Sequence, residues 1–529
     1  ALLRKVIEDA PTLSYRRDLA LSLGSFSNLV TNTKGLEASL PYNHEAIAIL
    51  EDLFEESELL ALTGDLSIEY GDLSRSFEKL EGPAAALPLR EKATQYARDW
   101  VAMSDIPKRR RDLSISLDHL ATLVNAVHGA AKALPLREEQ VMVLRSCVAE
   151  EADPNDPVSL AYAIAHVSEL VKTLEGPEPA RVYAREEEAL LRAAVDAAPN
   201  QSTELGLANA LQRLTTLTED IEGARDALPI CTKRLALVRD IHRREPTSQT
   251  RSHLYSAVAD LASMTDFLDG ATAGLPLWAE AVSITAERDA LDPSDGTKTD
   301  HANALHEHAL VLFQLGDTRS ADASWQQALS VLRKVKTPSD VRLWTLHLSL
   351  QALRHRALGE DPWAHAFALE LPPSCKPDML QEFVALRDDF AAWAAQSNDP
   401  DASAWATSAE VELARAIFAS GDLAGAHAHV QSLQDGIDAA YLRNPGLCKN
   451  LTRGFAMLAG GIAQAAGDAA KALAHLDRAE ALNHSSTPEA PYALRRSAMI
   501  AWHRSKALGQ DEAAAESRAV AQQAARAFA

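Results

Sequence analysis

The 529-residue sequence contains few cysteines, and none of them are paired. The four, Cys147, Cys231, Cys375 and Cys448, lie far apart and form no CxxC motif. Disulfide frameworks and structural zinc sites depend on closely spaced cysteines. This spacing is typical of reduced, buried thiols in a cytosolic protein.

Positive charge is also scarce. The chain has 52 Lys and Arg against 74 Asp and Glu, a formal net charge of −22 at pH 7. Nucleic-acid backbones are bound by neutralising phosphates with basic side chains, so nucleic acid is an unfavourable partner. An anionic membrane surface is disfavoured for the same reason. A protein or peptide with a basic patch would instead be attracted at long range.

Long apolar runs are missing as well. The longest uncharged stretch, residues 454–467, is rich in Gly and Ala and is too short to span a bilayer. No charged segment followed by an apolar run opens the chain, so no secretory signal is visible. We therefore expect a cytoplasmic protein.

The common catalytic and cofactor motifs do not occur. The sequence has no GxxxxGK[ST] or GxGxxG phosphate loop and no HExxH or GxSxG motif. The best metal candidates are His301, His306 and His308, but a zinc-binding helix would favour an i, i+4 pair with a carboxylate. We expect these histidines to serve packing or an interface, and we expect no enzyme activity, no cofactor and no metal.

The chain does contain a fixed repeat of 47 residues. Three columns of residues follow this period: turn glycines, leucines and small residues. The glycines are Gly35, Gly82, Gly129, Gly176, Gly223 and Gly270. The leucines are Leu19, Leu66, Leu113, Leu160, Leu207 and Leu254. The small residues are Ser27, Ser74, Ala121, Ser168, Thr215, Ala262 and Ala309. A period of this length indicates a solenoid, in which each unit buries its apolar face against its neighbours.

One unit, residues 112–158, reads as a helical hairpin. Leu113 begins an apolar stripe of helical spacing that continues to Val124. Gly129 should end this first helix in a left-handed cap. A second helix should run from about Ala133 to about Ala149 before a proline-containing connector. The sequence therefore predicts an all-α solenoid of antiparallel helical hairpins.

Several residues of this unit resemble the tetratricopeptide repeat (TPR) family. Leu120 is followed by the small Ala121, Gly129 occupies the turn, and Ala133 stands early in the second helix. Equivalent alanines recur at Ala86, Ala180, Ala227 and Ala321. The resemblance implies a right-handed superhelical solenoid. The Ala-Leu-Pro-Leu start of the second helix resembles the kinesin-light-chain-like branch, which is common in bacterial signalling proteins.

Some units depart from the family pattern. Gln140, Glu187 and Arg234 stand where the family usually keeps a small residue, so these units are expected to pack more loosely. Trp278 and Trp325, one period apart, fall at a family packing position and should be stacked in the core.

The regular array is expected to cover residues 1–336. Residues 337–400 should contain irregular repeats, with a proline-rich break at Leu371–Pro377 and an extra helix at about 379–395. Further hairpins should follow in residues 401–529. The break is either a hinge or a long connector between ordinary repeats.

Residues 1–12 match residues 236–247, five periods on, where a second helix ends. We therefore expect the chain to be the C-terminal part of a longer protein, with processing to a native N-terminus as the alternative.

The run Lys108–Arg111 is the densest basic segment. It is expected to be a solvated loop at the mouth of a helix rather than a site for an acidic partner.

Two functions follow from this architecture. The first is a non-catalytic scaffold that binds a peptide or partner protein on its concave face, which the first helices of hairpin superhelices line. A polar stripe on those helices avoids the packing columns, although each of its residues could simply be solvated. The stripe comprises Asn28, Arg75, Glu78, Thr122, Asn125, Glu169, Lys172 and Gln212.

The second function is a C-terminal sensor or regulatory arm of a larger bacterial signalling or defence protein. Its effector, an NTPase or a caspase-like protease, would lie upstream or in a partner protein. The truncated first hairpin and the branch resemblance motivate this hypothesis.

Overall fold

The structure is a computed structural model of the chain. It describes residues 2–9, 12–57, 62–150, 153–335, 375–397, 402–482 and 491–510, with short stretches at 345–347, 349–350, 352–354, 357, 513–517 and 519–520. Every regular element in these ranges is a helix. The fold is thus all-α, as predicted.

The chain forms two compact units, Ala1–Leu217 (unit 1) and Thr218–Ala529 (unit 2), and the boundary falls within α10 (Gln201–Glu222). The preceding helices are α1 (Leu2–Asp9), α2 (Leu13–Lys34), α3 (Leu36–Ser57), α4 (Leu62–Glu81), α5 (Pro83–Met103), α6 (Pro107–His128), α7 (Ala130–Ala149), α8 (Asp156–Glu175) and α9 (Pro177–Ala197). Those after α10 are α11 (Ala224–Arg244), α12 (Ser248–Asp269), α13 (Ala271–Leu291), α14 (Asp295–Gln314), α15 (Thr318–Leu332), α17 (Pro377–Gln396), α18 (Ala402–Ala419), α19 (Leu423–Arg443), α20 (Pro445–Ala465), α21 (Ala469–Ala481) and α22 (Pro491–Ala507).

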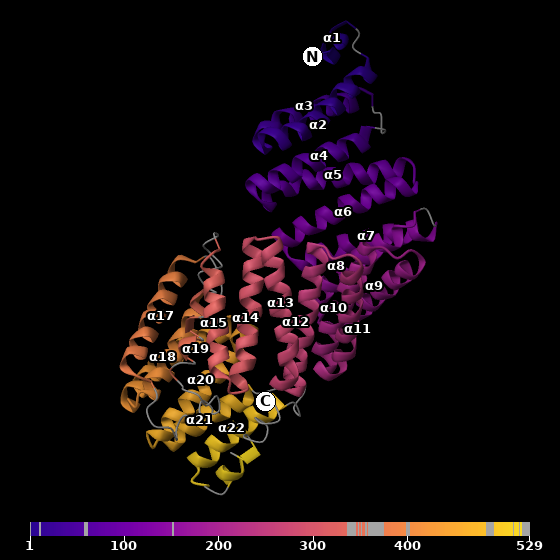
Figure 1. The fold of residues 1–529 in the computed structure, drawn as a ribbon. Helices are drawn as coiled ribbons and strands as arrows, with labels where there is room; N and C mark the ends of the chain where they lie inside the picture. Colours follow the sequence, from indigo (N-terminus) through magenta and orange to yellow (C-terminus); the bar gives the residue numbers. More distant parts are fainter. Residues whose placement is uncertain are drawn as a thin grey trace. The chain divides into compact units, whose positions relative to one another are not determined.

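Consecutive helices pack as pairs within each unit (Figure 1). In unit 1 the pairs are α2 with α3, α4 with α5, α6 with α7, and α8 with α9. Unit 2 contains the same kind of pair, for example α12 with α13 and α14 with α15. We call the first helix of each pair helix A and the second helix B. The second helix of one pair also packs against the first helix of the next, which makes the array a solenoid.

In the hairpins of the 47-residue series, a single glycine joins helix A to helix B. Gly129 has φ 83° and ψ 172°, a conformation that is essentially restricted to glycine. The φ angle is positive, as predicted, but the ψ angle differs from that of a left-handed cap. Helix B therefore begins at once, at Ala130 and not near Ala133, and Pro135 lies inside the helix. Because proline has no N–H, this position lacks one backbone hydrogen bond of the helix.

The later turns are longer, and their glycines also have positive φ angles. Between α14 and α15, the N–H of Asp317 donates to the carbonyl of Leu312 and that of Gly316 donates to the carbonyl of Phe313, both at 3.0 Å, which is the hydrogen-bond pattern of a Schellman motif. Gly316, Gly421, Gly467 and Gly509 also have positive φ angles, and so do all six glycines of the predicted series. Gly359, which the sequence suggests for another turn, lies outside the described residues.

The column of small residues lies at the contact between helix A and helix B, and all seven of its members are buried. In three hairpins the serine hydroxyl also donates a hydrogen bond to the backbone carbonyl of helix B twelve residues later. These bonds join Ser27 to Ser39 (3.2 Å), Ser74 to Ala86 (3.0 Å) and Ser168 to Ala180 (2.9 Å). The small side chain therefore permits close approach and supplies a polar tie between the helices.

The large polar residues in the small-residue position of helix B are also buried. Gln140, Glu187 and Arg234 expose only 5%, 1% and 1% of their surface. Each has a polar partner that compensates for its burial. The partners are Arg137 for Gln140 (2.9 Å), Arg213 for Glu187 (3.0 Å) and Asp260 for Arg234. The structure thus shows bonded interior groups at the positions that were expected to pack loosely.

Successive helices B are joined by a row of ion pairs, which we call the helix-B ladder. Each pair links residues 41 positions apart in neighbouring hairpins. The pairs in unit 1 are Arg4–Glu45 (2.6 Å), Lys92–Glu51 (3.8 Å), Arg98–Glu139 (2.7 Å) and Arg145–Glu186 (2.8 Å). In the pair Lys92–Glu51 the order is reversed: the earlier residue is acidic and the later residue is basic, whereas the other pairs have the arginine first. Arg239–Glu280 (2.6 Å) repeats the pattern in unit 2.

Unit 2 contains the two predicted core tryptophans. Trp278 and Trp325 expose 5% and 1% of their surface, and Trp325 packs in a cluster with α14 and α15. The extra helix expected at residues 379–395 is α17. Residues 371–374 of the proline-rich break lie outside the described residues, and the division at residues 336 and 400 stays a prediction.

All four cysteines are buried free thiols. Among the described helices, none is long and apolar enough to cross a membrane.

The basic run Lys108–Arg111 is not a loop, because it lies in the first turn of α6. Arg109 donates to the carbonyl of Trp100 (2.9 Å) and lies over its ring. Arg110 forms an ion pair with Glu150 (2.5 Å), and Arg111 forms one with Asp156 (3.4 Å). Three of the four basic residues therefore stabilise the fold.

Candidate functional site

Side chains from the first helices of the hairpins of unit 1 form one set of positions, spaced three or four residues apart along α4, α6 and α8; α10 has the additional residue Gln212 beside Arg213. This spacing places them on one face of each helix. We call this set the helix-A surface. It comprises Ile68, Asp72, Arg75 and Glu78 on α4, Ile115, His119, Thr122 and Asn125 on α6, Tyr162, His166, Glu169 and Lys172 on α8, and Asn209, Gln212, Arg213 and Thr216 on α10. Asn28 of α2 occupies the position equivalent to Arg75.

The eight residues of the predicted polar stripe all reach solvent. Six of them are exposed, while Lys172 and Gln212 are half-buried. Several also have partners within the chain. The Asn28 amide donates to Asp72 at 3.4 Å, and Arg75 forms an ion pair with the same carboxylate. These contacts tie α2 to α4 and order part of the stripe.

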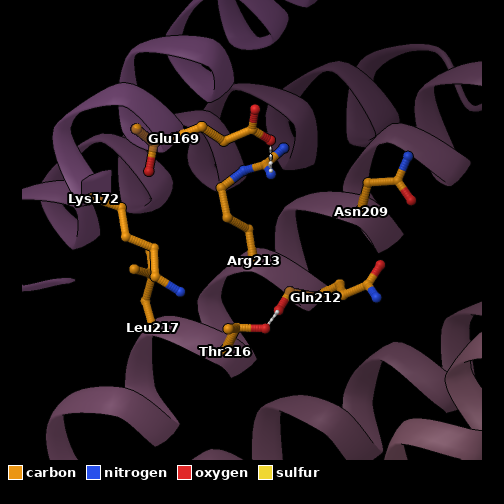
Figure 2. A pocket seen from close by; sticks show the side chains of 8 residues that line it. Glu169, Lys172, Asn209, Gln212, Arg213, Thr216 and Leu217 are labelled. Atoms are coloured by element: carbon orange, nitrogen blue, oxygen red, sulfur yellow. Dashed lines mark hydrogen bonds and ion pairs between the residues drawn. The ribbon is translucent and has the colours of Figure 1, made fainter. Parts of the chain in front are cut away.

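A groove of about 390 Å³ lies between α8 and α10 (Figure 2). It brings together three of the predicted residues, Glu169, Lys172 and Gln212. The other five predicted residues do not line it. The rest of the lining was not predicted to bind a partner and consists of Ser168, which was assigned to the small-residue column, and Asn209, Arg213, Thr216 and Leu217.

Arg213 organises the groove. Its Nη1 donates to Glu169 at 2.9 Å and its Nε donates to Glu187 at 3.0 Å, so it joins α10 to both helices of the preceding hairpin (Figure 2). Burial raises the pKa of Glu187, and the ion pair with Arg213 opposes that effect. Arg213 therefore fixes the floor of the groove and neutralises Glu169 at its edge.

Two carboxamides stand one helical turn apart on the groove side of α10. Asn209 and Gln212 extend from the same helix, and Thr216 follows one turn later (Figure 2). A carboxamide carries both donors and an acceptor, which match the N–H and C=O of a peptide backbone. The groove can thus bind polar main-chain groups, and Lys172 adds a cation on the opposite wall.

The histidines that were weighed as metal ligands have other partners. His301 hydrogen-bonds Thr285 (3.0 Å), His306 accepts from the indole N–H of Trp325 (3.1 Å), and His308 contacts Ser324 (3.4 Å). Within the part of the chain that the structure describes, no group of three potential ligands is placed to hold a metal. The packing role expected for these histidines agrees with these contacts.

No protein-family model matches the sequence, and a search of curated proteins found no match. Among solved structures, the chain is similar to a Signal Transduction ATPase with Numerous Domains (STAND) protein with a tetratricopeptide repeat sensor from Pyrococcus horikoshii. That match has 13% identity and a TM-score of 0.39, and it covers 75% of this chain and 53% of that one. The present chain therefore spans about half the length of this structure. A tetratricopeptide repeat protein from Parabacteroides merdae is similar at 14% identity and a TM-score of 0.37, with 66% of this chain and 98% of that chain covered.

The class of the fold follows from the features of the chain itself. Paired helices, a positive-φ glycine in each turn and a buried small column between the helices define an all-α solenoid of TPR-like hairpins.

Proposed function

We propose that this chain is a non-catalytic protein-interaction scaffold, which binds an extended peptide or a segment of a partner protein along the helix-A surface of unit 1. The groove between α8 and α10 is the observation that carries the proposal. It lies on the face that the sequence predicts to be concave, and its lining combines carboxamides, hydroxyls and a lysine.

An extended segment suits these groups because its backbone leaves N–H and C=O groups unpaired. A helix or a folded surface has already used most of its backbone groups, and it would offer the carboxamides of Asn209 and Gln212 fewer partners. The Asn209 side chain makes no hydrogen bond with any residue that the structure describes, so it can bind a ligand without losing a contact.

Unpaired negative charge contributes less to ligand binding in this groove than the net charge of −22 suggests. Glu169 and Asp72 already have arginine partners within the chain. We infer that the negative charge of the protein attracts a basic partner at long range, whereas hydrogen bonds determine which segment is retained. Glu78 is the acidic residue of the predicted stripe most suited to a cationic side chain, because it is exposed and is not among the paired carboxylates.

The hypotheses of a particular TPR branch and of a sensor role rest on sequence motifs. The Ala-Leu-Pro-Leu segments support a kinesin-light-chain-like branch, and with it a role as the sensor arm of a signalling protein whose effector is a separate domain or partner. Cloning the complete reading frame tests this role, because it requires an NTPase or protease domain upstream or in a co-purifying partner.

A peptide-display selection tests the groove assignment. A random library is selected on the intact chain, and the enriched peptides are titrated by calorimetry against an Asn209→Ala, Gln212→Ala variant. We expect their affinity to fall about tenfold, since two hydrogen bonds of about 0.5–1.5 kcal/mol each are lost. Glu138→Ala, at an exposed site on the helix-B face of α7, is the matched control and should leave affinity unchanged. Equal binding by the groove variant and the control would refute the assignment.

A further inference from the structure

Arg90 of α5 is a buried cation without a counter-ion. The residue exposes only 5% of its surface. Its Nη2 donates to the backbone carbonyl of Gly71 in α4 at 2.8 Å, and its Nε has no hydrogen-bond partner among the described residues. It forms no ion pair with any residue that the structure describes. Because burying an unpaired charge costs free energy, an anion that reaches this guanidinium should bind favourably.

The next hairpin contains the counter-ion that this one lacks. Arg137 of α7 lies 47 residues after Arg90, at the equivalent position, and it is equally buried, with 5% of its surface exposed. Its Nη1 forms an ion pair with Asp118 of α6. Asp118 lies 47 residues after Gly71. The α4–α5 hairpin therefore keeps the buried arginine of the repeat but has glycine in place of its carboxylate.

The two neutral partners of Arg137 are replaced as well. Arg137 donates to the carboxamide of Gln140 at 2.9 Å and to the hydroxyl of Thr122 at 2.8 Å. The equivalent residues of the α4–α5 hairpin are Ala93 and Arg75. Alanine has no polar group, and arginine cannot accept a hydrogen bond. No side chain at these positions can therefore take over the role of the lost carboxylate.

Gly71 leaves space in front of the guanidinium. A Cβ atom added at Gly71 would lie 3.0 Å from Nη1 of Arg90, and the three nearest atoms from other parts of the chain all belong to Arg90. Gly71 lies three residues after Ile68 and four before Arg75, on the same face of α4. The equivalent side chain of Asp118 is 38% exposed, so a group at this position is reached from solvent.

The neighbouring charges leave Arg90 cationic. Burial, followed by the charge of Arg75, lowers the pKa of Arg90 to about 10, while the carboxylates of Asp72 and Glu78 oppose this shift. Arg90 therefore carries its charge at pH 7. Asp72 is already paired with Arg75 and also accepts from the amide of Asn28 at 3.4 Å. Its partners are thus on the solvent side of the stripe, and the guanidinium of Arg90 stays available to a ligand.

We propose that Arg90 and the space left by Gly71 form a carboxylate-binding site on the helix-A surface. A carboxylate of the ligand accepts hydrogen bonds from the guanidinium of Arg90, as the carboxylate of Asp118 does from Arg137 within the chain. The inference rests on the proposed function in one respect, because it names a group that the bound segment presents. A basic partner can satisfy it with one acidic residue or with its C-terminus.

Acetate, the carboxylate alone, tests the site. It is titrated into the intact chain labelled with ¹⁵N-arginine, and the Nε–H signal of Arg90, assigned with Arg90→Lys, is followed by NMR. We expect a saturable shift with acetate and none with chloride at the same ionic strength. Gly71→Asp should abolish the shift, because its carboxylate takes the place of the ligand. Gly436→Asp, at a glycine of α19 with open space around its Cβ position, is the matched control and should preserve the shift.

The next hairpin offers the reverse experiment. Asp118→Gly removes the internal counter-ion of Arg137. We expect the Nε–H signal of Arg137 to become sensitive to acetate in this variant, whereas it should not respond in the unaltered chain. Circular dichroism checks that each variant remains helical. This second variant keeps the inference testable if Gly71→Asp fails to fold.

Peptides from the display selection identify the source of the carboxylate. Each is synthesised with its acidic residues changed one at a time to Asn or Gln, and with an amidated C-terminus. We expect one of these changes to weaken binding to the intact chain about tenfold or more, since a hydrogen-bonded ion pair is lost. The same change should have less than about a twofold effect on binding to the Gly71→Asp variant. A side-chain change that weakens binding identifies Asp or Glu, and amidation that does so identifies the C-terminus.

The outcomes separate this inference from the proposed function. No acetate shift at Arg90, an equal shift in Gly71→Asp, or an equal shift with chloride would each overturn the site. Peptides that require Asn209 and Gln212 but tolerate neutralisation of every carboxylate would also overturn the inference, and the groove would remain a peptide site. If acetate binds at Arg90 while no display peptide responds to groove variants, the carboxylate site stands and the proposed function fails.

Discussion

Replacing the turn glycine Gly129 with alanine isolates the cost of one backbone conformation. Gly129 has φ 83°, and no atom lies within 4 Å of the position that a Cβ would occupy. The substitution therefore creates no steric clash with neighbouring residues, and only the strain of the positive φ angle remains. That strain costs about 1–3 kcal/mol. At 25 °C we expect local opening of the α6–α7 hairpin to become about 5- to 150-fold more frequent.

Hydrogen–deuterium exchange with mass spectrometry measures this opening for peptides from α6 and α7. Gly436 provides the matched control. It also has open space around its Cβ position, but it lies inside α19 with no positive φ angle. Gly436→Ala should stabilise its helix by about 0.4–1 kcal/mol and slow local exchange. If both substitutions changed exchange in the same direction, backbone conformation would not be the reason for glycine at the turns.

Three further predictions concern the interior. Ala121→Leu should destabilise the fold by about 1–3 kcal/mol through overpacking, whereas Asn125→Ala on the exposed face should cost less than about 0.5 kcal/mol in urea unfolding. Burial raises the pKa of Glu69 from 4.5 to about 7, so its contribution to stability should be present below about pH 4.5 and lost as the pH rises through about 7. The Gln variant of Glu69 should flatten this part of the stability profile, and an unchanged slope would refute the assignment. Arg213→Met should cost about 3–5 kcal/mol because it leaves the buried Glu187 unpaired, and adding Glu187→Gln should restore much of that loss. Additive effects of these two substitutions would show that the pair is not coupled.

The repeat period alone predicted the hairpins, the turn glycines and the small column. These features follow from requirements that recur in every unit. A turn with positive φ needs glycine, and two closely packed helices need a small side chain such as Ala121 between them. The period also predicted which positions of helix A reach solvent, as Glu169 and Lys172 illustrate.

The groove lining was harder to predict because it depends on contacts between neighbouring hairpins. Arg213 is held by Glu187, a residue 26 positions earlier whose burial a search for small residues could not anticipate. Asn209 was missed because earlier members of its column are apolar, which made that column resemble core. The basic residues Arg109 to Arg111 were assigned to a loop because their partners, Trp100, Glu150 and Asp156, lie outside the helix that they begin.

The helix-B ladder restricts how the number of repeats in this array can change during evolution. Recombination between 47-residue repeats can remove one hairpin without breaking the reading frame or the helical pattern. Loss of α6 and α7 would bring Arg98 opposite Glu186, which again forms an ion pair. Loss of α4 and α5 would instead bring Glu51 opposite Glu139, where two carboxylates repel each other. Because the pair Lys92–Glu51 is exchanged, deletion of the hairpin α4–α5 is less favourable than deletion of the neighbouring hairpin α6–α7.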